Sequence, residues 1–191
     1  AMDDFPLRKD WEKRKENYFS SDLLNIVTAT DFLTALTLLS TFKASGTVSC
    51  KKKDVLALQL TTYKKYADDL CKGFSVADKL LQEERIFSSR DLPYSTQLLP
   101  LATICTVLMD GNKIYTTTVR NMVKQWYWCG VFGELYGSAN ETRCANDVTQ
   151  VIKWITGSGN LPKTVTDFFF NPIRLLGLQS RQSAAYKGIM A

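Results

Sequence analysis

Two carboxylates, Glu134 and Asp147, could face one cleft and bind a metal ion through their oxygen atoms. Arg143 lies four residues before Asp147, the spacing at which opposite charges pair along the surface of a helix. An exposed ion pair of that kind stabilises a fold only slightly. The sequence favours this surface pair over a metal site, so we expect no metal ion here.

The chain contains no histidine among its 191 residues. This excludes Ser–His and Cys–His nucleophile pairs and zinc sites built on imidazole. The sequence also contains no glycine-rich phosphate loop, Walker-type lysine or dinucleotide-binding fingerprint. We therefore expect no catalytic residue and no cofactor in this chain.

Three consecutive lysines, Lys51, Lys52 and Lys53, could contact the phosphate backbone of a nucleic acid. The chain has 24 Lys and Arg against 19 Asp and Glu, a net charge of +5, which permits a nucleic-acid partner without requiring one. A run this short is also typical of a solvated loop, because affinity for nucleic acid draws on several phosphate contacts. DNA is thus a candidate partner, with this loop as the contact.

Aromatic residues gather in the segment that begins at Trp126 and could stack on nucleobases. Trp126 and Trp128 lie on apolar stripes, which favours core packing for both. Tyr127 and Tyr136 are less committed to the core and remain candidates for a cleft or an interface.

A polar loop, residues 88–94, precedes the most apolar segment of the chain. Within it, Arg90 could pair locally with Asp91 or contact a partner domain. Tyr94 ends the loop and belongs with the same candidate interface residues.

Helices must position all of these side chains, because the hydrophobic spacing predicts an all-α fold in one domain with long loops. Residues 98–109 are apolar on nearly every side, which predicts a buried central helix. Residues 156–179 are expected to be irregular. Five predicted helices have ranges read from the hydrophobic spacing: about 8–18, 61–81 with Thr61 as its cap, 98–109, about 116–135, and 180–191. Two more are recognised by their capping residues. One begins at Thr28 with Asp31 and is stopped by residues 45–46, and the other begins at the capping box of Ser138 and Glu141.

The predicted helix at 61–81 has one apolar stripe. Its opposite face carries lysines and aspartates at i,i+4 spacing, as in Lys64 with Asp68, and is expected to be solvated.

Two glycines, Gly130 and Gly133, lie inside the predicted helix at 116–135. Each is unfavourable there by about 1 kcal/mol relative to alanine. We expect them to admit the backbone of a neighbouring element.

The five cysteines form no Cys-x-x-Cys pair, which favours reduced thiols and a cytoplasmic protein. No signal peptide is visible, and the longest apolar run, 98–109, is shorter than the roughly 20 residues that span a bilayer. We expect no membrane partner. Ala1 and Met2 resemble a cloning remnant, and the chain ends inside a predicted helix, so we expect an excised piece of a larger multidomain protein. The oligomeric state is not indicated.

Residues 126–143 (WYWCGVFGELYGSANETR), followed by Asp147 and Trp154, resemble the helical region of the GmrSD-type family. This bacterial family is related to modification-dependent, type IV restriction endonucleases and is often known only as a domain of unknown function. Three further stretches are similar to the same region in the same order: residues 30–39 (TDFLTALTLL), 91–94 (DLPY) and 183–188 (SAAYKG).

The resemblance implies a parent protein with a nucleotide-dependent N-terminal domain, a helical domain and often a His-Asn-His-type nuclease domain. The family's N-terminal motif, similar to Asp-Gly-Gln-Gln-Arg, is absent from this chain, and the nuclease needs a histidine. Neither catalytic motif can therefore be placed on any residue here.

The expected function is that of a non-catalytic helical domain in a GmrSD-type restriction or antiphage defence protein. It would connect the nucleotide-dependent domain to the nuclease as a scaffold or contact DNA, with neighbouring domains of the same parent chain as its partners. The alternative is a helical protein-interaction module of a nucleotide-dependent regulatory or defence protein that does not contact DNA. Salt-dependent DNA binding would separate the two.

Overall fold

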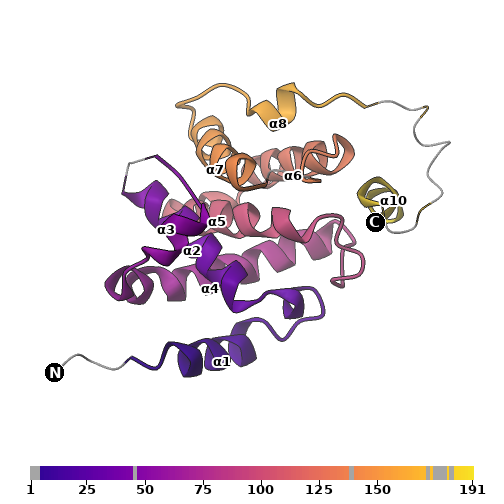
Figure 1. Ribbon diagram of the computed structural model, residues 1–191. Helices are drawn as coiled ribbons and strands as arrows, with labels where there is room; N and C mark the ends of the chain where they lie inside the picture. The colour runs from indigo at the N-terminus through magenta and orange to yellow at the C-terminus, as the bar shows by residue number, and fades with distance from the viewer. Residues whose placement is uncertain (1–4, 45–46, 138–139, 171–172, 174–179, 181–182) are drawn as a thin grey trace.

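The computed structural model describes residues 5–44, 47–137, 140–170, 173, 180 and 183–191. Every regular element within these ranges is a helix, so the predicted all-α fold is confirmed (Figure 1). Three short 3-10 helices, η1 (Leu24–Ile26), η2 (Ser95–Gln97) and η3 (Asp110–Tyr115), connect longer elements. The α-helices are α1 (Leu7–Tyr18), α2 (Ala29–Lys43), α3 (Lys52–Leu56), α4 (Leu60–Glu83), α5 (Leu98–Met109), α6 (Thr117–Phe132), α7 (Asn140–Ile155), α8 (Lys163–Thr166) and α10 (Ala184–Met190).

Helix α5 lies at the centre of the molecule, as its composition predicts. It packs against α4, α2 and α7, and ten of its residues are buried. Its two threonines are buried without an unsatisfied hydroxyl, because Thr103 donates to the Leu99 carbonyl (3.0 Å) and Thr106 to the Ala102 carbonyl (2.7 Å). A helix that satisfies its own polar groups can be covered on all sides.

The start of α2 is also as predicted. Thr28 accepts a hydrogen bond from the Asp31 backbone N–H (3.1 Å), and the Asp31 carboxylate accepts one from the Thr28 N–H (2.9 Å). This reciprocal capping box satisfies two donors at the helix N-terminus. The predicted stop at residues 45–46 and the predicted cap at Ser138 lie outside the described residues.

Helix α4 is longer than predicted and begins differently. Gln59 is its N-cap, and Thr61 lies inside the helix, so the predicted Thr61 cap is wrong. Its polar face is exposed as predicted, and α1 packs beside it. Asp68 accepts from Arg14 of α1 (2.6 Å) in place of the predicted lysine partners.

Polar contacts fasten α1 to α4. Arg14 donates to Asp10 (2.6 Å) as well as to Asp68, and the Tyr63 hydroxyl donates to Asp10 (2.6 Å). Burial disfavours the charged form of Asp10, but the hydrogen bonds from Tyr63 and Arg14 prevail and lower the pKa of this carboxyl group. Aromatic contacts from Trp11 to Phe19 and Phe32 complete the attachment.

Close helix packing falls at a glycine that the sequence did not single out. A Cβ atom on Gly73 of α4 would lie 2.7 Å from the Ala102 carbonyl oxygen of α5. A Cβ on Gly130 would instead meet the Gln97 side chain (2.4 Å), and one on Gly133 would meet its own Cys129 carbonyl (2.7 Å). The expectation that Gly130 and Gly133 admit a neighbouring backbone is therefore wrong, and Gly73 has that role.

The C-terminal third forms the outer layer. Helices α6 and α7 lie above α5, α8 lies across them, and α10 packs on α6 at one end of the molecule (Figure 1). Helix α6 ends at Phe132, before the predicted Leu135. Helix α10 lies within the predicted 180–191 helix, and its N-cap is Ser183, whose hydroxyl accepts from the Tyr186 N–H (3.2 Å).

Candidate functional site

The candidate site is built around the buried carboxylate of Asp147, which follows the segment 126–143 that carries the family resemblance. Asp147 lies on α7 and is only 1% exposed. The Tyr136 hydroxyl donates to one of its oxygens (2.5 Å), and the Thr164 hydroxyl donates to the other (2.7 Å). Three separate parts of the chain therefore meet at one side chain: α7, the turn after α6, and α8.

The protonation behaviour of this group follows from its burial. Burial raises the pKa of Asp147, while hydrogen bonds from Tyr136 and Thr164 and the positive charge of Arg143 oppose that rise. Burial, with the nearby charge of Asp147, also raises the pKa of Tyr136 well above its usual range. Tyr136 consequently stays protonated and remains a donor to the carboxylate.

The predicted surface pair of Arg143 and Asp147 is wrong. Arg143 donates to the Thr164 hydroxyl (3.1 Å), and Thr164 in turn donates to Asp147. Asp147 is enclosed because the turn at residues 133–137 and α8 both fold over this face of α7. Arg143 therefore acts on the carboxylate through a hydroxyl and through its charge.

Beside this network the surface is hollowed into a recess of about 420 Å³. We call it the Asp147 recess. Its lining mixes two cationic and two acidic side chains with two neutral polar ones and one leucine. The lining residues are Glu134, Leu135, Thr142, Arg143, Asn146, Asp147 and Lys163.

Backbone geometry brings Glu134 to this recess. Gly133 is the C-cap of α6, and Glu134 takes the left-handed conformation, with φ of 52°. The Leu135 N–H donates back to the Gly130 carbonyl (3.0 Å), which closes the turn. The chain thus reverses sharply and sends Tyr136 inward to Asp147.

The recess is suited to holding a polar group. Arg143, Lys163, Thr142 and Asn146 offer hydrogen-bond donors at its wall, and Glu134 offers an acceptor. Both oxygens of Asp147 already accept hydrogen bonds, so this carboxylate supports the wall. Among the described residues, no group of three or more Cys, Asp or Glu side chains is placed to hold a metal ion.

Several candidate residues named from the sequence do converge here. Glu134, Arg143 and Asp147 line the recess, and Tyr136 donates a hydrogen bond to Asp147. Tyr94 packs its ring against Tyr136, with 6.3 Å between the ring centroids.

The other candidates lie elsewhere. Tyr127 is fully buried beside Trp128, and burial raises its pKa, so the structure places its ring in the core and out of reach of a nucleobase. Arg90 lies in a different pocket, beside α10. The predicted Arg90–Asp91 pair is not the main local contact, because Asp91 accepts from the Ser88 hydroxyl (2.8 Å) and N–H (3.2 Å).

The three lysines do not line the recess. Lys51 is the N-cap of α3, and Lys52 and Lys53 form its first turn. The prediction that they belong to a loop is therefore wrong, although all three are exposed as predicted.

Sequence reasoning missed Thr164 and Lys163. Both fall in the stretch expected to be irregular, and a four-residue helix gives no periodic signal. Pro162, directly before the helix, was the available sign, because proline is favoured near helix starts.

No protein-family model, curated protein or solved structure matches this chain. In the part of the chain that the structure describes, no helix is long and apolar enough to cross a membrane.

Proposed function

We propose that this chain forms a non-catalytic helical domain of a GmrSD-type restriction or antiphage defence protein. In this proposal it lies between a nucleotide-dependent domain and a nuclease domain, where it acts as a scaffold or contacts DNA. The proposal rests on the sequence resemblance. The observation that supports it is the Asp147 recess. Residues 126–147, which carry the strongest resemblance, supply the side chains of the recess and of the hydrogen bonds beside it: Glu134, Tyr136, Arg143 and Asp147.

A DNA contact through the three lysines has a physical basis. Lys51, Lys52 and Lys53 are exposed at the start of α3, and none forms an ion pair with a described residue. Their charges are therefore available to phosphates. Contacts of this kind do not depend on base sequence and weaken with salt, because binding releases condensed counterions.

The test is a titration of the protein with modified and unmodified DNA duplexes at several salt concentrations. Replacing Lys51, Lys52 and Lys53 by glutamine should weaken binding to both duplexes equally. It should also flatten the salt dependence by up to about three units of slope, since each phosphate that a lysine neutralises adds roughly 0.9 to that slope.

A matched control removes the same charge from α4. Lys64, Lys65 and Lys72 are exposed, but the first two lie over aromatic rings and Lys72 pairs with Asp69. Their replacement by glutamine should change the affinity much less. Equal effects of the two triple variants would contradict the proposed contact.

The alternative, a protein-interaction module without DNA contact, is favoured by a different observation. Large apolar side chains are exposed in one stretch that follows α8, namely Phe169 (80%), Phe170 (41%) and Ile173 (75%). Exposed apolar groups that gather in one region are typical of interaction surfaces. Unchanged affinity and unchanged salt slope in the Lys51–Lys53 variant would favour this alternative.

A further inference from the structure

A second pocket, distinct from the Asp147 recess, lies where α10 meets the end of α4. Its volume is about 260 Å³. Three cationic side chains line it, Arg85, Arg90 and Lys187, together with the ring of Tyr186 and a single acidic side chain, Asp91. We call it the α10 pocket.

Each cation reaches the pocket from a different segment. Arg85 follows the C-cap of α4 in the left-handed conformation, with φ of 64°. Arg90 belongs to the loop before η2. Lys187 lies on α10, and its ammonium group donates to the Leu92 carbonyl (3.2 Å), which ties the helix to that loop. The pocket is therefore created by the docking of α10.

The two arginines of the pocket differ from the other arginines that the structure describes. Arg8, Arg14 and Arg120 each pair with a carboxylate, and Arg143 donates to Thr164. Within the described residues, Arg85 and Arg90 have neither an ion pair nor a hydrogen-bond partner for their guanidinium groups. Both are exposed.

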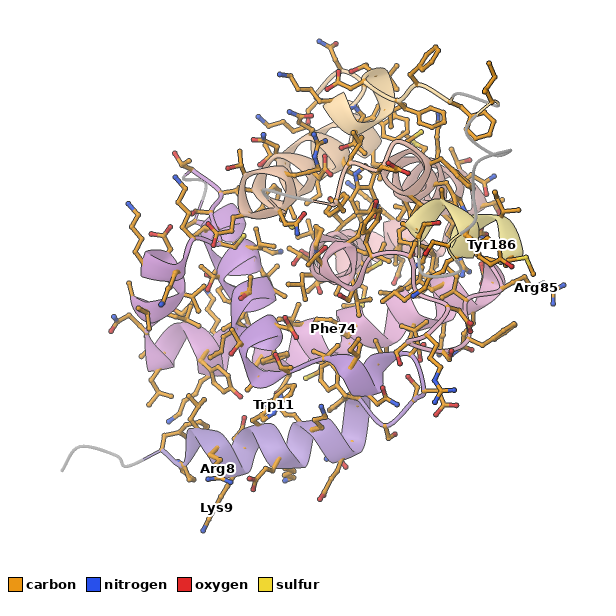
Figure 2. The ribbon with its side chains drawn as sticks, turned by 45° about the vertical axis from the view of Figure 1, so that its right-hand side comes forward. Arg8, Lys9, Trp11, Phe74, Arg85 and Tyr186 are labelled. Carbon is orange, nitrogen blue, oxygen red and sulfur yellow. The ribbon has the colours of Figure 1, made fainter. Side chains whose placement is uncertain are left out.

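The acidic residue of the pocket does not neutralise them. Asp91 accepts from the Ser88 hydroxyl and N–H, which hold its carboxylate within its own loop. Figure 2 shows Arg85 and Tyr186 at the same end of the molecule, with Arg85 extending away from the ribbon. Two unpaired guanidinium groups, a lysine and a tyrosine therefore line one small pocket, and each of these side chains can donate hydrogen bonds.

We propose that the α10 pocket binds a phosphate group. Guanidinium groups present donors in a planar fork that matches phosphate oxygens and can bind them in pairs. The Tyr186 hydroxyl is a further donor, and Lys187 adds positive charge. The phosphate could come from a DNA backbone or from a free nucleotide, and both carry the same chemistry.

The pocket is tested with the whole chain and three probes: inorganic phosphate, a nucleoside triphosphate and a short DNA duplex. The variant combines Arg85→Asn and Arg90→Gln. Asparagine is chosen because it tolerates the left-handed conformation that residue 85 adopts. The affinity for whichever probe binds to the native protein should fall about tenfold or more, equivalent to about 1.4 kcal/mol.

The control removes two charges elsewhere by Arg8→Gln and Lys9→Gln. Figure 2 shows Arg8 and Lys9 on α1, remote from Arg85 and Tyr186. This variant should keep native affinity. Circular dichroism and a thermal melt should show that both variants keep the native fold. The single variant Arg90→Gln, which leaves the α4 C-terminus untouched, should show part of the loss.

The probes also identify the source of the phosphate. If the Arg85/Arg90 variant loses affinity for the duplex alone, the pocket is assigned to a nucleic-acid backbone. If it loses affinity for the triphosphate, the pocket is assigned to a nucleotide. Three outcomes overturn the proposal: the native protein binds none of the probes, the Arg85/Arg90 variant keeps native affinity, or the Arg8/Lys9 control loses as much affinity as the variant does. The first outcome would also count against the DNA contact proposed above. The other two leave that contact open, and it is tested separately with Lys51, Lys52 and Lys53.

Discussion

At the scale of single residues, the hydroxyl of Tyr136 shows how a buried charge is kept in this fold. Asp147 is 1% exposed, and Tyr136 and Thr164 each donate to one of its oxygens. A buried acceptor has lost its hydrogen bonds to water, and this desolvation is no longer compensated when its donor in the protein is removed. The network is therefore expected to be sensitive to the loss of one oxygen atom.

Replacing Tyr136 by phenylalanine should lower the free energy of unfolding by about 1–3 kcal/mol, because one Asp147 oxygen loses its donor. Urea denaturation measures this. Tyr115→Phe is the control, since Tyr115 is 57% exposed, and it should change stability little.

The same variant has a defined pH dependence. The pKa of Asp147 in the fold is raised by burial above its ordinary value of 3.8. A carboxyl group whose pKa is higher in the folded state contributes its full stabilisation at pH values below its unfolded-state pKa. That stabilisation is lost as the pH rises through its folded-state pKa. Without the Tyr136 hydroxyl the charged form loses support and the pKa rises further. The Tyr136→Phe deficit should thus be large at neutral pH and shrink on acidification, and a constant deficit would contradict this account.

Gly73 is the second residue whose size is fixed by its surroundings. Adding a Cβ there would bring it within 2.7 Å of the Ala102 carbonyl oxygen and 1.9 Å of the Thr106 hydroxyl oxygen. Gly73→Ala should destabilise the protein by about 1–3 kcal/mol through overpacking, in spite of alanine's higher helix propensity. Gly137→Ala is the control, because its Cβ would meet its nearest atom at 3.7 Å. A melting temperature for Gly73→Ala equal to that of the control would rule out the close approach of α4 and α5.

At the scale of elements, α1 differs from the helices of the core. None of its residues is buried, and it lies on the outside of α4 (Figure 1). Arg14 holds it there through Asp68, and the Tyr63 hydroxyl holds it through Asp10, while only 14% of the Arg14 side chain is exposed. The attachment consists of a few polar and aromatic contacts and buries no residue of α1, so α1 should open independently of the core.

Replacing Arg14 by alanine should therefore increase amide hydrogen exchange throughout α1 and leave exchange in α5 unchanged. Asp10 and Asp68 both lose their guanidinium partner in this variant. Arg8→Ala is the control, since its pair with Glu12 is exposed and worth little. Equal exchange in the two variants, or a parallel increase in α5, would show that Arg14 does not fasten α1 in this way.

At the scale of the whole molecule, the helices form successive layers around α5. Helices α2 and α4 cover one side of it, and α7 with α6 covers the other (Figure 1). All five cysteines are buried within this arrangement and are unpaired. Burial raises the pKa of Cys71 to about 11 and that of Cys105 to about 12, which disfavours the reactive thiolate.

The thiols should accordingly report unfolding of the whole molecule. In the native protein Cys71 and Cys105 should react slowly with a disulfide reagent such as Ellman's reagent, and in denaturant all five thiols should react rapidly. Absorbance at the reagent's product band gives the number of reacted thiols. Rapid reaction of all five thiols under native conditions would contradict the packing described for α4, α5 and α7.

The sequence alone determined the features that depend on neighbouring residues. The apolar character of residues 98–109 defined α5 and its burial, and Thr28 with Asp31 defined the start of α2. These signals are local, because helix periodicity and capping involve residues three or four positions apart. Glu134 and Asp147 also line one recess, the shared cleft that the sequence left open, because the turn after α6 brings Glu134 beside α7.

Only the tertiary structure decided which partner each polar side chain takes. Asp68 meets Arg14 across 54 residues, Lys187 meets the Leu92 carbonyl across 95, and Asp147 meets Thr164 from a helix too short to be periodic. Gly73 became the site of closest packing because α5 crosses it. A charged residue forms a hydrogen bond with whichever group the packed helices bring within about 3 Å. Which group this is depends on how whole helices pack, and residue spacing within one helix does not determine it.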